Sequence, residues 1–303
     1  MSSEGFKILF TGLDAAGKTS IILSLMREIS KIAILAPTKS ASRRTYNFLG
    51  TDISEWDLGG QKRYREEYLK NPKFFDLTDI TIYVIDIQNR ARIEEALDYL
   101  NEIIKIFIKL KIDPPIYIFF HKYDPVFVSK AYKETGDFIR KLELLVRELS
   151  DKKVLFFKTS IYNLPTIISA MSTVLLSKYP KKDLLEKTIK DFAPKFKAEG
   201  IELIDDNSLV IASHYKNDEV KEILSSSTHY FLSLNDVLIK PPSSKQETNL
   251  MQVERSGYYF LFKQFSLKYG DPPYYLLLLK NDQHFSLDEF NALVNILVNI
   301  LYK

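Results

Sequence analysis

Cysteine is absent from this 303-residue chain, so disulfide bonds and thiolate metal sites are excluded. Histidine is scarce, and no two of the four, His121, His214, His229 and His284, have the spacing of a metal-binding pair. Excess charge is also missing: a net charge of +3 is too small to indicate a protein that binds nucleic acid, which would carry a strongly basic domain or stripe.

Long apolar runs are missing too. No run approaches the roughly 20 residues that span a bilayer, and the first residues lack the charged and apolar segments of a signal peptide. Position 2 is Ser2, which excludes an N-myristoyl glycine. We therefore expect a cytoplasmic protein without a membrane span, and recruitment to a membrane by a partner stays open.

The composition that remains is that of a folded protein, with 46% apolar and 27% charged residues. The length predicts two domains at roughly 150 residues each. In the first 180 residues, short β-branched or aromatic runs alternate with helical patterns, which predicts an α/β fold: a mostly parallel six-stranded sheet with helices on both faces. The expected strands are 7–11, 45–49, 52–56, 80–86, 116–120 and 154–158; the expected helices lie near 17–30, 62–70, 91–111, 129–150 and 163–178.

The pattern changes after Pro180, so we place a domain boundary there, giving domains 1–180 and 181–303. The second domain is expected to be an α+β module with an antiparallel sheet. Its expected elements are a helix over 183–198, a hairpin of 201–204 and 209–213 around the turn 205–208, a helix over 217–238, a polar loop over 240–248, strands over 258–267 and 274–280, and a helix over 286–302.

The stretch G12-L-D-A-A-G-K-T19 matches the phosphate-loop pattern, two glycines followed by lysine and threonine, between a predicted strand and a predicted helix. Backbone N–H groups of such a loop surround an anion, and the helix N-terminus favours it further. The alternative, a glycine turn before a capped helix, needs all three features to coincide by chance. The candidate phosphate-binding residues are Asp14, Ala15, Ala16, Gly17, Lys18, Thr19 and Ser20.

A second motif, W56-D-L-G-G-Q61, follows the third predicted strand. Asp57 is placed to hold Mg²⁺ through water, and the backbone N–H of Gly60 is placed to approach a γ-phosphate. Gln61 is the candidate catalytic residue, because it is placed to orient an attacking water. Alone, such a tetrapeptide is more often an ordinary turn; joined to the phosphate loop, it predicts a nucleotide site.

Two further segments follow the fifth and sixth strands. In H121-K-Y-D124, a carboxylate at Asp124 accepts from N1–H and the exocyclic amine of guanine, whereas adenine offers a lone pair at N1. Lys122 is expected to lay its stem along the base and ribose. The backbone of T159-S-I161 is expected to reach the guanine O6. The candidate base-binding residues are His121, Lys122, Asp124, Thr159, Ser160 and Ile161.

Taken in order, these motifs resemble those of Ras-superfamily GTPases, and the phosphate loop and W56-D-L-G-G-Q61 have the forms of the Arf branch. Thr38 lies 18 residues before Trp56, the spacing of the switch I threonine in Arf-like proteins, although the residues after it depart from the usual Arf pattern. H121-K-Y-D124 departs from Asn-Lys-x-Asp and is similar to the Rag GTPases, as are I82-Y-V-I-D86 and T159-S-I161.

The resemblance implies a molecular switch that binds and slowly hydrolyses GTP, with GTP or GDP and Mg²⁺ as cofactors. It implies that Thr19, Thr38 and Asp57 organise the Mg²⁺. It also implies a small GTPase domain over 1–180 and a roadblock or longin-like domain over 181–303 through which Rag proteins dimerise. The partners so implied are a second copy or another roadblock or longin protein, an exchange factor and a GTPase-activating protein.

Several alternatives stay open at this point. A scaffold with negligible turnover that assembles a complex through its second domain is one, although Gln61 and Thr38 disfavour it. Asp124 disfavours a P-loop ATPase or kinase. The basic side chains of both switch segments predict a solvated face or a docking surface for an acidic partner, and less readily an arginine supplied to the site by Arg43 or Arg44; they are Lys39, Arg43, Arg44, Lys62, Arg63 and Arg65.

Overall fold

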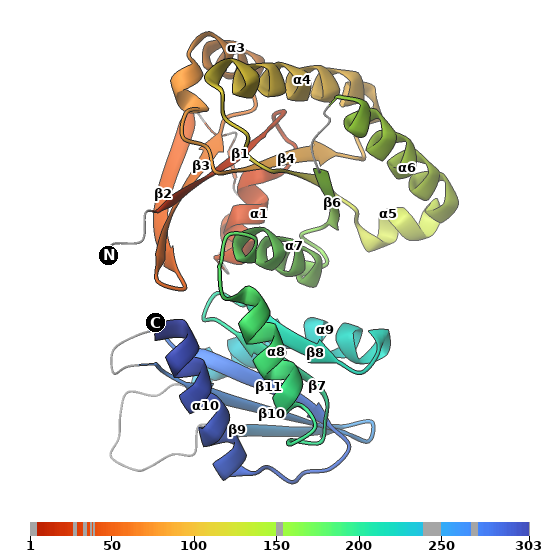
Figure 1. Ribbon diagram of the computed structural model, residues 1–303. Helices are drawn as coiled ribbons and strands as arrows, with labels where there is room; N and C mark the ends of the chain where they lie inside the picture. Colours follow the sequence, from red (N-terminus) through yellow and green to blue (C-terminus); the bar gives the residue numbers. More distant parts are fainter. Residues whose placement is uncertain are drawn as a thin grey trace. The chain divides into compact units, whose positions relative to one another are not determined.

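The computed structural model describes residues 5–26, 29–32, 35–36, 38, 40–149, 154–238, 250–267 and 272–302. The chain divides into two compact units, Met1–Ala170 and Met171–Lys303, and the division falls within helix α7, Leu164–Leu176. Lys39 and the predicted loop 240–248 lie outside the described residues. The two units are treated separately below (Figure 1).

The described strands of the first unit form one sheet in the order β2-β3-β1-β4-β5-β6. Only β2 runs antiparallel to its neighbour, which confirms the predicted mostly parallel sheet. Ile8, Leu9 and Phe10 are fully buried, as expected of a strand covered on both faces. The strands are β1 Phe6–Gly12, β2 Ala41–Phe48, β3 Thr51–Leu58, β4 Ile80–Asp86, β5 Ile116–His121 and β6 Val154–Thr159.

Helices cover both faces of this sheet: α3, α4 and α6 lie on one face and α1 and α7 on the other (Figure 1). The helix predicted near 129–150 corresponds to α6, which begins at Tyr132. A separate helix, α5, which was not predicted, comes before it, because Ala131 leaves helical conformation (φ −144°, ψ 45°). The described helices are α1 Lys18–Leu25, α2 Ile29–Ile32, α3 Lys62–Lys70, α4 Ile93–Leu110, α5 Pro125–Lys130 and α6 Tyr132–Leu149, with 3₁₀ turns η1 Pro72–Phe74 and η2 Arg90–Arg92.

The second unit contains an antiparallel sheet with the described order β8-β7-β11-β10-β9. Helices α8 and α10 lie on one face, and α9 packs its apolar side on the other (Figure 1). After α7, the elements are α8 Lys182–Phe192, β7 Ala198–Ile204, β8 Val210–Tyr215, α9 Asp218–Leu238, β9 Leu250–Arg255, β10 Tyr258–Phe265, β11 Tyr274–Lys280 and α10 Leu287–Tyr302.

The structure departs from the predicted second domain in two places. The helix expected over 183–198 ends at Phe192, two residues before Pro194, which cannot continue a helix. Strand β9 was not predicted as a separate strand. It pairs with β10 across a two-residue turn in which Ser256 and Gly257 both have positive φ (54° and 80°), the backbone that suits a tight hairpin. Among the described helices, none is long and apolar enough to cross a bilayer.

Candidate functional site

A cavity of about 410 Å³ opens in the first unit, where the loops after several strands meet. Its volume is in the range of small-molecule sites, roughly 300–1,000 Å³. All four motif segments and Thr38 reach it, from parts of the sequence more than 100 residues apart. The lining residues are Asp14, Ala15, Gly17, Lys18, Thr19, Ser20, Leu35, Ala36, Thr38, Gly60, Gln61, His121, Lys122, Asp124, Ile161 and Tyr162.

Most of the predicted site residues line this cavity directly. Leu35, Ala36 and Tyr162 were not predicted. Four predicted residues do not line the cavity, namely Ala16, Asp57, Thr159 and Ser160. Of these, Asp57, Thr159 and Ser160 are hydrogen-bonded to residues that do.

The phosphate-loop segment bends tightly between β1 and α1. Gly12, Ala15 and Gly17 all have positive φ (136°, 57° and 97°). Gly17 is the N-cap residue of α1. The ammonium group of Lys18 is buried and donates to the carbonyl oxygens of Gly12 (3.0 Å) and Leu13 (2.8 Å). Burial lowers the pKa of Lys18 to about 8. A bound anion would offset the cost of burying the charged ammonium group of Lys18.

Three oxygen-bearing side chains meet beside the loop. The hydroxyl of Thr19 donates to Asp57 Oδ2 at 2.5 Å and lies 2.8 Å from the hydroxyl of Thr38, which is 3.5 Å from the same carboxylate oxygen. Burial raises the pKa of Asp57. Among the described residues, none gives a hydrogen bond to the buried Oδ1 of Asp57. Mg²⁺ prefers oxygen ligands, and a bound cation would interact with the carboxylate oxygen that has no hydrogen bond. Thr19, Thr38 and Asp57 therefore fit the predicted Mg²⁺.

The segment around Gly60 packs tightly against the phosphate loop. A Cβ atom on Gly60 would lie 2.2 Å from the backbone nitrogen of Asp14, so only glycine fits there. Gln61 is the N-cap residue of α3, where its carbonyl accepts from the N–H groups of Tyr64 (2.9 Å) and Arg65 (3.0 Å). The cap fixes the backbone of Gln61 and leaves its side chain to line the cavity.

The carboxylate of Asp124 is held by two donors from other segments. Ser160 Oγ donates to Oδ1 at 2.5 Å, and Gln88 Nε2 donates to Oδ2 at 2.8 Å. The same Gln88 amide donates to the carbonyl of Lys122 at 2.8 Å, and Lys122 has the positive φ of 62°. Lys122 Nζ is paired with Asp86 at 2.6 Å. Gln88 was not predicted, because it belongs to none of the motifs.

His121 is buried between two of the motif segments. Its Nδ1 lies 2.9 Å from the hydroxyl of Thr159, and burial lowers its pKa to about 4, so the ring is neutral at physiological pH. On its other side the ring contacts the phosphate loop, since a Cβ on Gly17 would lie 2.4 Å from His121 Cδ2. The histidine therefore ties the phosphate loop to the T159-S-I161 segment.

The two arginines considered as internal catalytic groups are engaged away from the cavity. Arg43 Nε donates to Ser54 Oγ at 3.0 Å. Arg44 Nη2 donates to both carboxylate oxygens of Glu55, at 2.8 and 2.9 Å. The expectation that Arg65 belongs to a solvated face was wrong: Arg65 is only 7% exposed.

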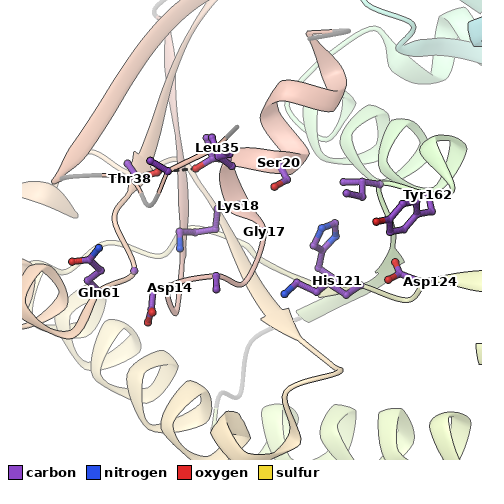
Figure 2. A pocket seen from close by; sticks show the side chains of 16 residues that line it. Asp14, Gly17, Lys18, Ser20, Leu35, Thr38, Gln61, His121, Asp124 and Tyr162 are labelled. Atoms are coloured by element: carbon purple, nitrogen blue, oxygen red, sulfur yellow. Dashed lines mark hydrogen bonds between the residues drawn. The ribbon is translucent and has the colours of Figure 1, made fainter. Parts of the chain in front are cut away.

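Figure 2 shows that the cavity has two chemically distinct ends. Thr38, Gln61 and Asp14 gather at one end, and Asp124 and Tyr162 lie at the other, with Lys18 and His121 between them. The hydroxyl and carboxylate groups suited to Mg²⁺ therefore lie at the end opposite Asp124. This arrangement suits an elongated ligand with an anionic end and an end that carries hydrogen-bond donors.

Two known proteins are similar to this chain over part of its length. An ADP-ribosylation factor-like protein 3 from Chlamydomonas reinhardtii is 36% identical over 120 residues, which cover 40% of this chain and 64% of that protein. The match thus spans less than two thirds of the relative's length. The structure of the Arl6 BBS3 small GTPase from Trypanosoma brucei with bound nucleotide analogue GppNp is 17% identical, covers 57% of this chain and 96% of its own, and has a TM-score of 0.43.

The conserved region of the Gtr1/RagA G proteins matches residues 7–233, which include the whole cavity and continue into the second unit as far as α9. This match covers about three quarters of the chain and confirms the resemblance to Rag-type small GTPases. The chain therefore belongs to the Gtr1/RagA family of G proteins.

Proposed function

We propose that this protein is a guanine-nucleotide-dependent molecular switch that binds and slowly hydrolyses GTP, and that its second domain serves dimerisation or partner binding. One observation carries the proposal: the base-recognition carboxylate, the phosphate loop and an oxygen cluster suited to Mg²⁺ surround a single cavity of about 410 Å³. Sites of this kind change loop conformation when the terminal phosphate is lost.

At the base end, Asp124 accepts hydrogen bonds from N1–H and the exocyclic amine of guanine. Its two supporting donors, Ser160 and Gln88, bond to different oxygens of the carboxylate and so fix its plane. The stem of Lys122 lies along the base and ribose, and the backbone of Ser160 and Ile161 reaches O6. Adenine offers no donor at N1, so guanine is selected.

At the other end, Lys18 and the backbone from Asp14 to Thr19 hold the phosphates. Thr19, Thr38 and Asp57 are the residues that would hold Mg²⁺, which when bound neutralises charge on the phosphate oxygens. Gln61 orients the attacking water. No arginine is found among the described residues that line the cavity, so we propose that a GTPase-activating partner supplies one.

The rate of GTP cleavage tests this proposal. In a single-turnover assay with the purified full-length chain and Mg²⁺, we expect roughly 10⁻⁴ to 10⁻² s⁻¹, the range of such proteins without an added arginine. Gln61→Leu should slow cleavage and leave GTP binding intact. A rate indistinguishable from GTP in buffer would support the alternative, a nucleotide-binding scaffold with negligible turnover.

We propose that the domains are 1–180 and 181–303 and that the second is a roadblock or longin-like dimerisation module. The observed order of helix, two strands, helix, three strands and helix supports this, as does an exposed apolar row on α9. The row consists of Tyr230 (68% exposed), Leu234 (44%) and Val237 (79%), which have helical spacing. Among the described strands, β9 lies at the edge of the sheet beside β10, and this edge adds a second surface for pairing.

Sedimentation of the full-length chain at increasing concentration tests this module, both alone and with candidate roadblock proteins. We expect Tyr230→Glu combined with Val237→Glu to reduce association. The control is Leu144→Glu, which changes an exposed leucine (63%) on α6 of the first unit. A wild-type chain that stays monomeric under every condition would contradict the proposed role.

A further inference from the structure

An acidic side chain lies at the phosphate end of the cavity. Asp14 lines the cavity, and Figure 2 places it beside Lys18 and Gln61, at the end away from Asp124. A carboxylate at this position repels the phosphate group nearest to it. The charge of Asp14 therefore opposes binding of a terminal phosphate unless another group offsets it.

Arg92 is the residue that pairs with this carboxylate. It is the last residue of η2 and precedes α4, and its guanidinium donates to Asp14 Oδ1 at 2.9 Å across 78 residues of sequence. Arg92 does not itself line the large cavity, so it reaches Asp14 from outside. Both side chains are only partly exposed, 31% for Arg92 and 37% for Asp14, which reduces screening by solvent relative to a fully exposed pair.

Arg92 is fixed in this position by a chain of charged groups. Its Nε donates to Glu95 at 2.8 Å, and the same carboxylate is paired with the buried Arg65. Arg65 Nε in turn donates to the carbonyl of Gly60 at 2.9 Å. Hydrogen bonds from Arg92 and Arg65 lower the pKa of Glu95 to about 2, so Glu95 stays charged at physiological pH.

The chain of ion pairs thus begins at the phosphate loop and ends at the segment that packs against it. A Cβ on Gly60 would lie 2.2 Å from the nitrogen of Asp14, so the two ends are neighbours. Among the described residues that line the cavity, Asp14 is the one that accepts a hydrogen bond from Arg92.

We infer that Arg92 is a positioning residue: it offsets the charge of Asp14 and holds that carboxylate back from the terminal phosphate, so that the cavity accepts GTP as well as GDP. The inference rests on the proposed binding of guanine nucleotides. Without Arg92, the unpaired Asp14 carboxylate disfavours the nucleotide with the additional phosphate.

Calorimetric titration of the full-length protein tests this role, with GDP and with guanosine 5′-(β,γ-imido)triphosphate as ligands in the presence of Mg²⁺. Arg92→Ala should weaken binding of the triphosphate analogue about tenfold and of GDP about twofold or less, since only the former places charge next to Asp14. In an Asp14→Ala background, Arg92→Ala should no longer change the ratio of the two affinities.

Arg90→Ala is the matched control. Arg90 belongs to the same 3₁₀ turn, but it pairs with Glu134 at 2.6 Å and lies over the ring of Phe138. Its removal changes the net charge by the same amount and should leave the affinity ratio unchanged. If Arg92→Ala does not fold, Arg92→Gln and the double variant with Asp14→Ala replace it.

An unchanged ratio, an equal loss for both nucleotides, or the same selective loss in the Asp14→Ala background would overturn the role of Arg92. An Arg90→Ala variant with the same selective loss would do so too, because the effect would then follow net charge alone. A wild-type protein that binds neither nucleotide would instead contradict the proposed function.

Discussion

Each of the two units buries a carboxylate among hydroxyl groups, and the two carboxylates are satisfied to different extents. In the second unit, Glu202 on β7 accepts from Tyr215 (2.6 Å) and Ser225 (3.4 Å) at one oxygen and from Thr228 at the other. In the first unit, Asp57 accepts from hydroxyl groups at Oδ2 alone, and none of the described residues donates to Oδ1. Burial raises the pKa of both.

The difference shows how a structural group is distinguished from a binding group. A buried carboxylate whose oxygens are both hydrogen-bonded by its own fold belongs to the core. A buried carboxylate with an oxygen left over, beside a cavity, is suited to a ligand that the chain does not supply. Asp57→Asn and Glu202→Gln test this comparison between the two units. Gly17→Ala and the titration of Lys18 test the cavity beside Asp57.

The largest effect is expected from Asp57→Asn. The amide has no negative charge to hold Mg²⁺, so the Mg²⁺-dependent affinity for GTP should fall about 100-fold. Titration with and without EDTA measures it: the variant and the wild type should differ in Mg²⁺ and agree in EDTA. Glu202→Gln is the control in the other unit and should leave GTP affinity unchanged. Equal affinities of Asp57→Asn and wild type in Mg²⁺ would count against the metal site.

The second-largest effect is expected from Gly17→Ala. Its backbone φ of 97° disfavours any L side chain, and the added methyl would lie 2.4 Å from the ring of the buried His121. We expect a loss of stability of about 2–4 kcal/mol, combining backbone strain with overpacking, and weaker GDP binding. Thermal unfolding and GDP titration check both.

The matched control for this substitution is Gly136→Ala in α6. Apart from the adjacent residues and the backbone of the helix itself, no heavy atom of the described residues lies within 4 Å of the added methyl. Alanine in a helix interior stabilises by about 0.5–1 kcal/mol relative to glycine. If Gly17→Ala were as stable as Gly136→Ala, the contact between the phosphate loop and His121 would be absent in solution.

A smaller effect, confined to the second unit, is expected from Glu202→Gln. Burial raises the pKa of Glu202 above 4.5, so the folded state favours the protonated acid. As pH rises from the unfolded pKa through the folded pKa, the wild type therefore loses stability that the glutamine variant keeps. Hydrogen exchange of β7 and α9 amides should show the variant becoming better protected than wild type as pH rises. Parallel pH profiles would mean that Glu202 does not titrate as described.

The smallest effect concerns Lys18, whose pKa in the free protein is about 8. Bound phosphates favour the charged ammonium and raise this pKa, so binding GDP above pH 8 should take up a proton. Affinity should therefore decline severalfold as pH rises from about 8 to 10. Calorimetry in two buffers of different ionisation enthalpy measures the proton uptake; none at pH 9 would show that Lys18 is already fully charged in the free protein.

The parts of the site that the sequence predicts are the local ones. Lys18 and Thr19 begin the helix that comes after β1, Asp57 lies at the end of β3, and Lys122 directly follows β5. Parallel strands bring their carboxyl ends to one edge of a sheet. A motif of four to eight residues at each strand end is therefore enough to predict that these side chains meet. The same locality makes the hairpin around 205–208 predictable.

The supporting residues could not be found in this way. Gln88 bonds to Asp124 across 36 residues, and Arg92 bonds to Asp14 across 78. Neither residue belongs to a motif, and a polar residue between a strand and the following helix has the same local appearance in the sequence whether or not it has such a partner. Arg65 looked like part of a basic surface because its ion pair with Glu95 exists only once α3 and α4 pack on the same face of the sheet.

The central claim is that the cavity of the first unit is a guanine-nucleotide site. Its most direct test is calorimetric titration of the nucleotide-free full-length protein with GDP and, separately, with ADP, both in Mg²⁺. The account predicts that GDP binds at least about 100-fold more tightly than ADP, because only guanine donates to both oxygens of Asp124. Equal affinities for the two nucleotides, or binding of neither, would contradict it.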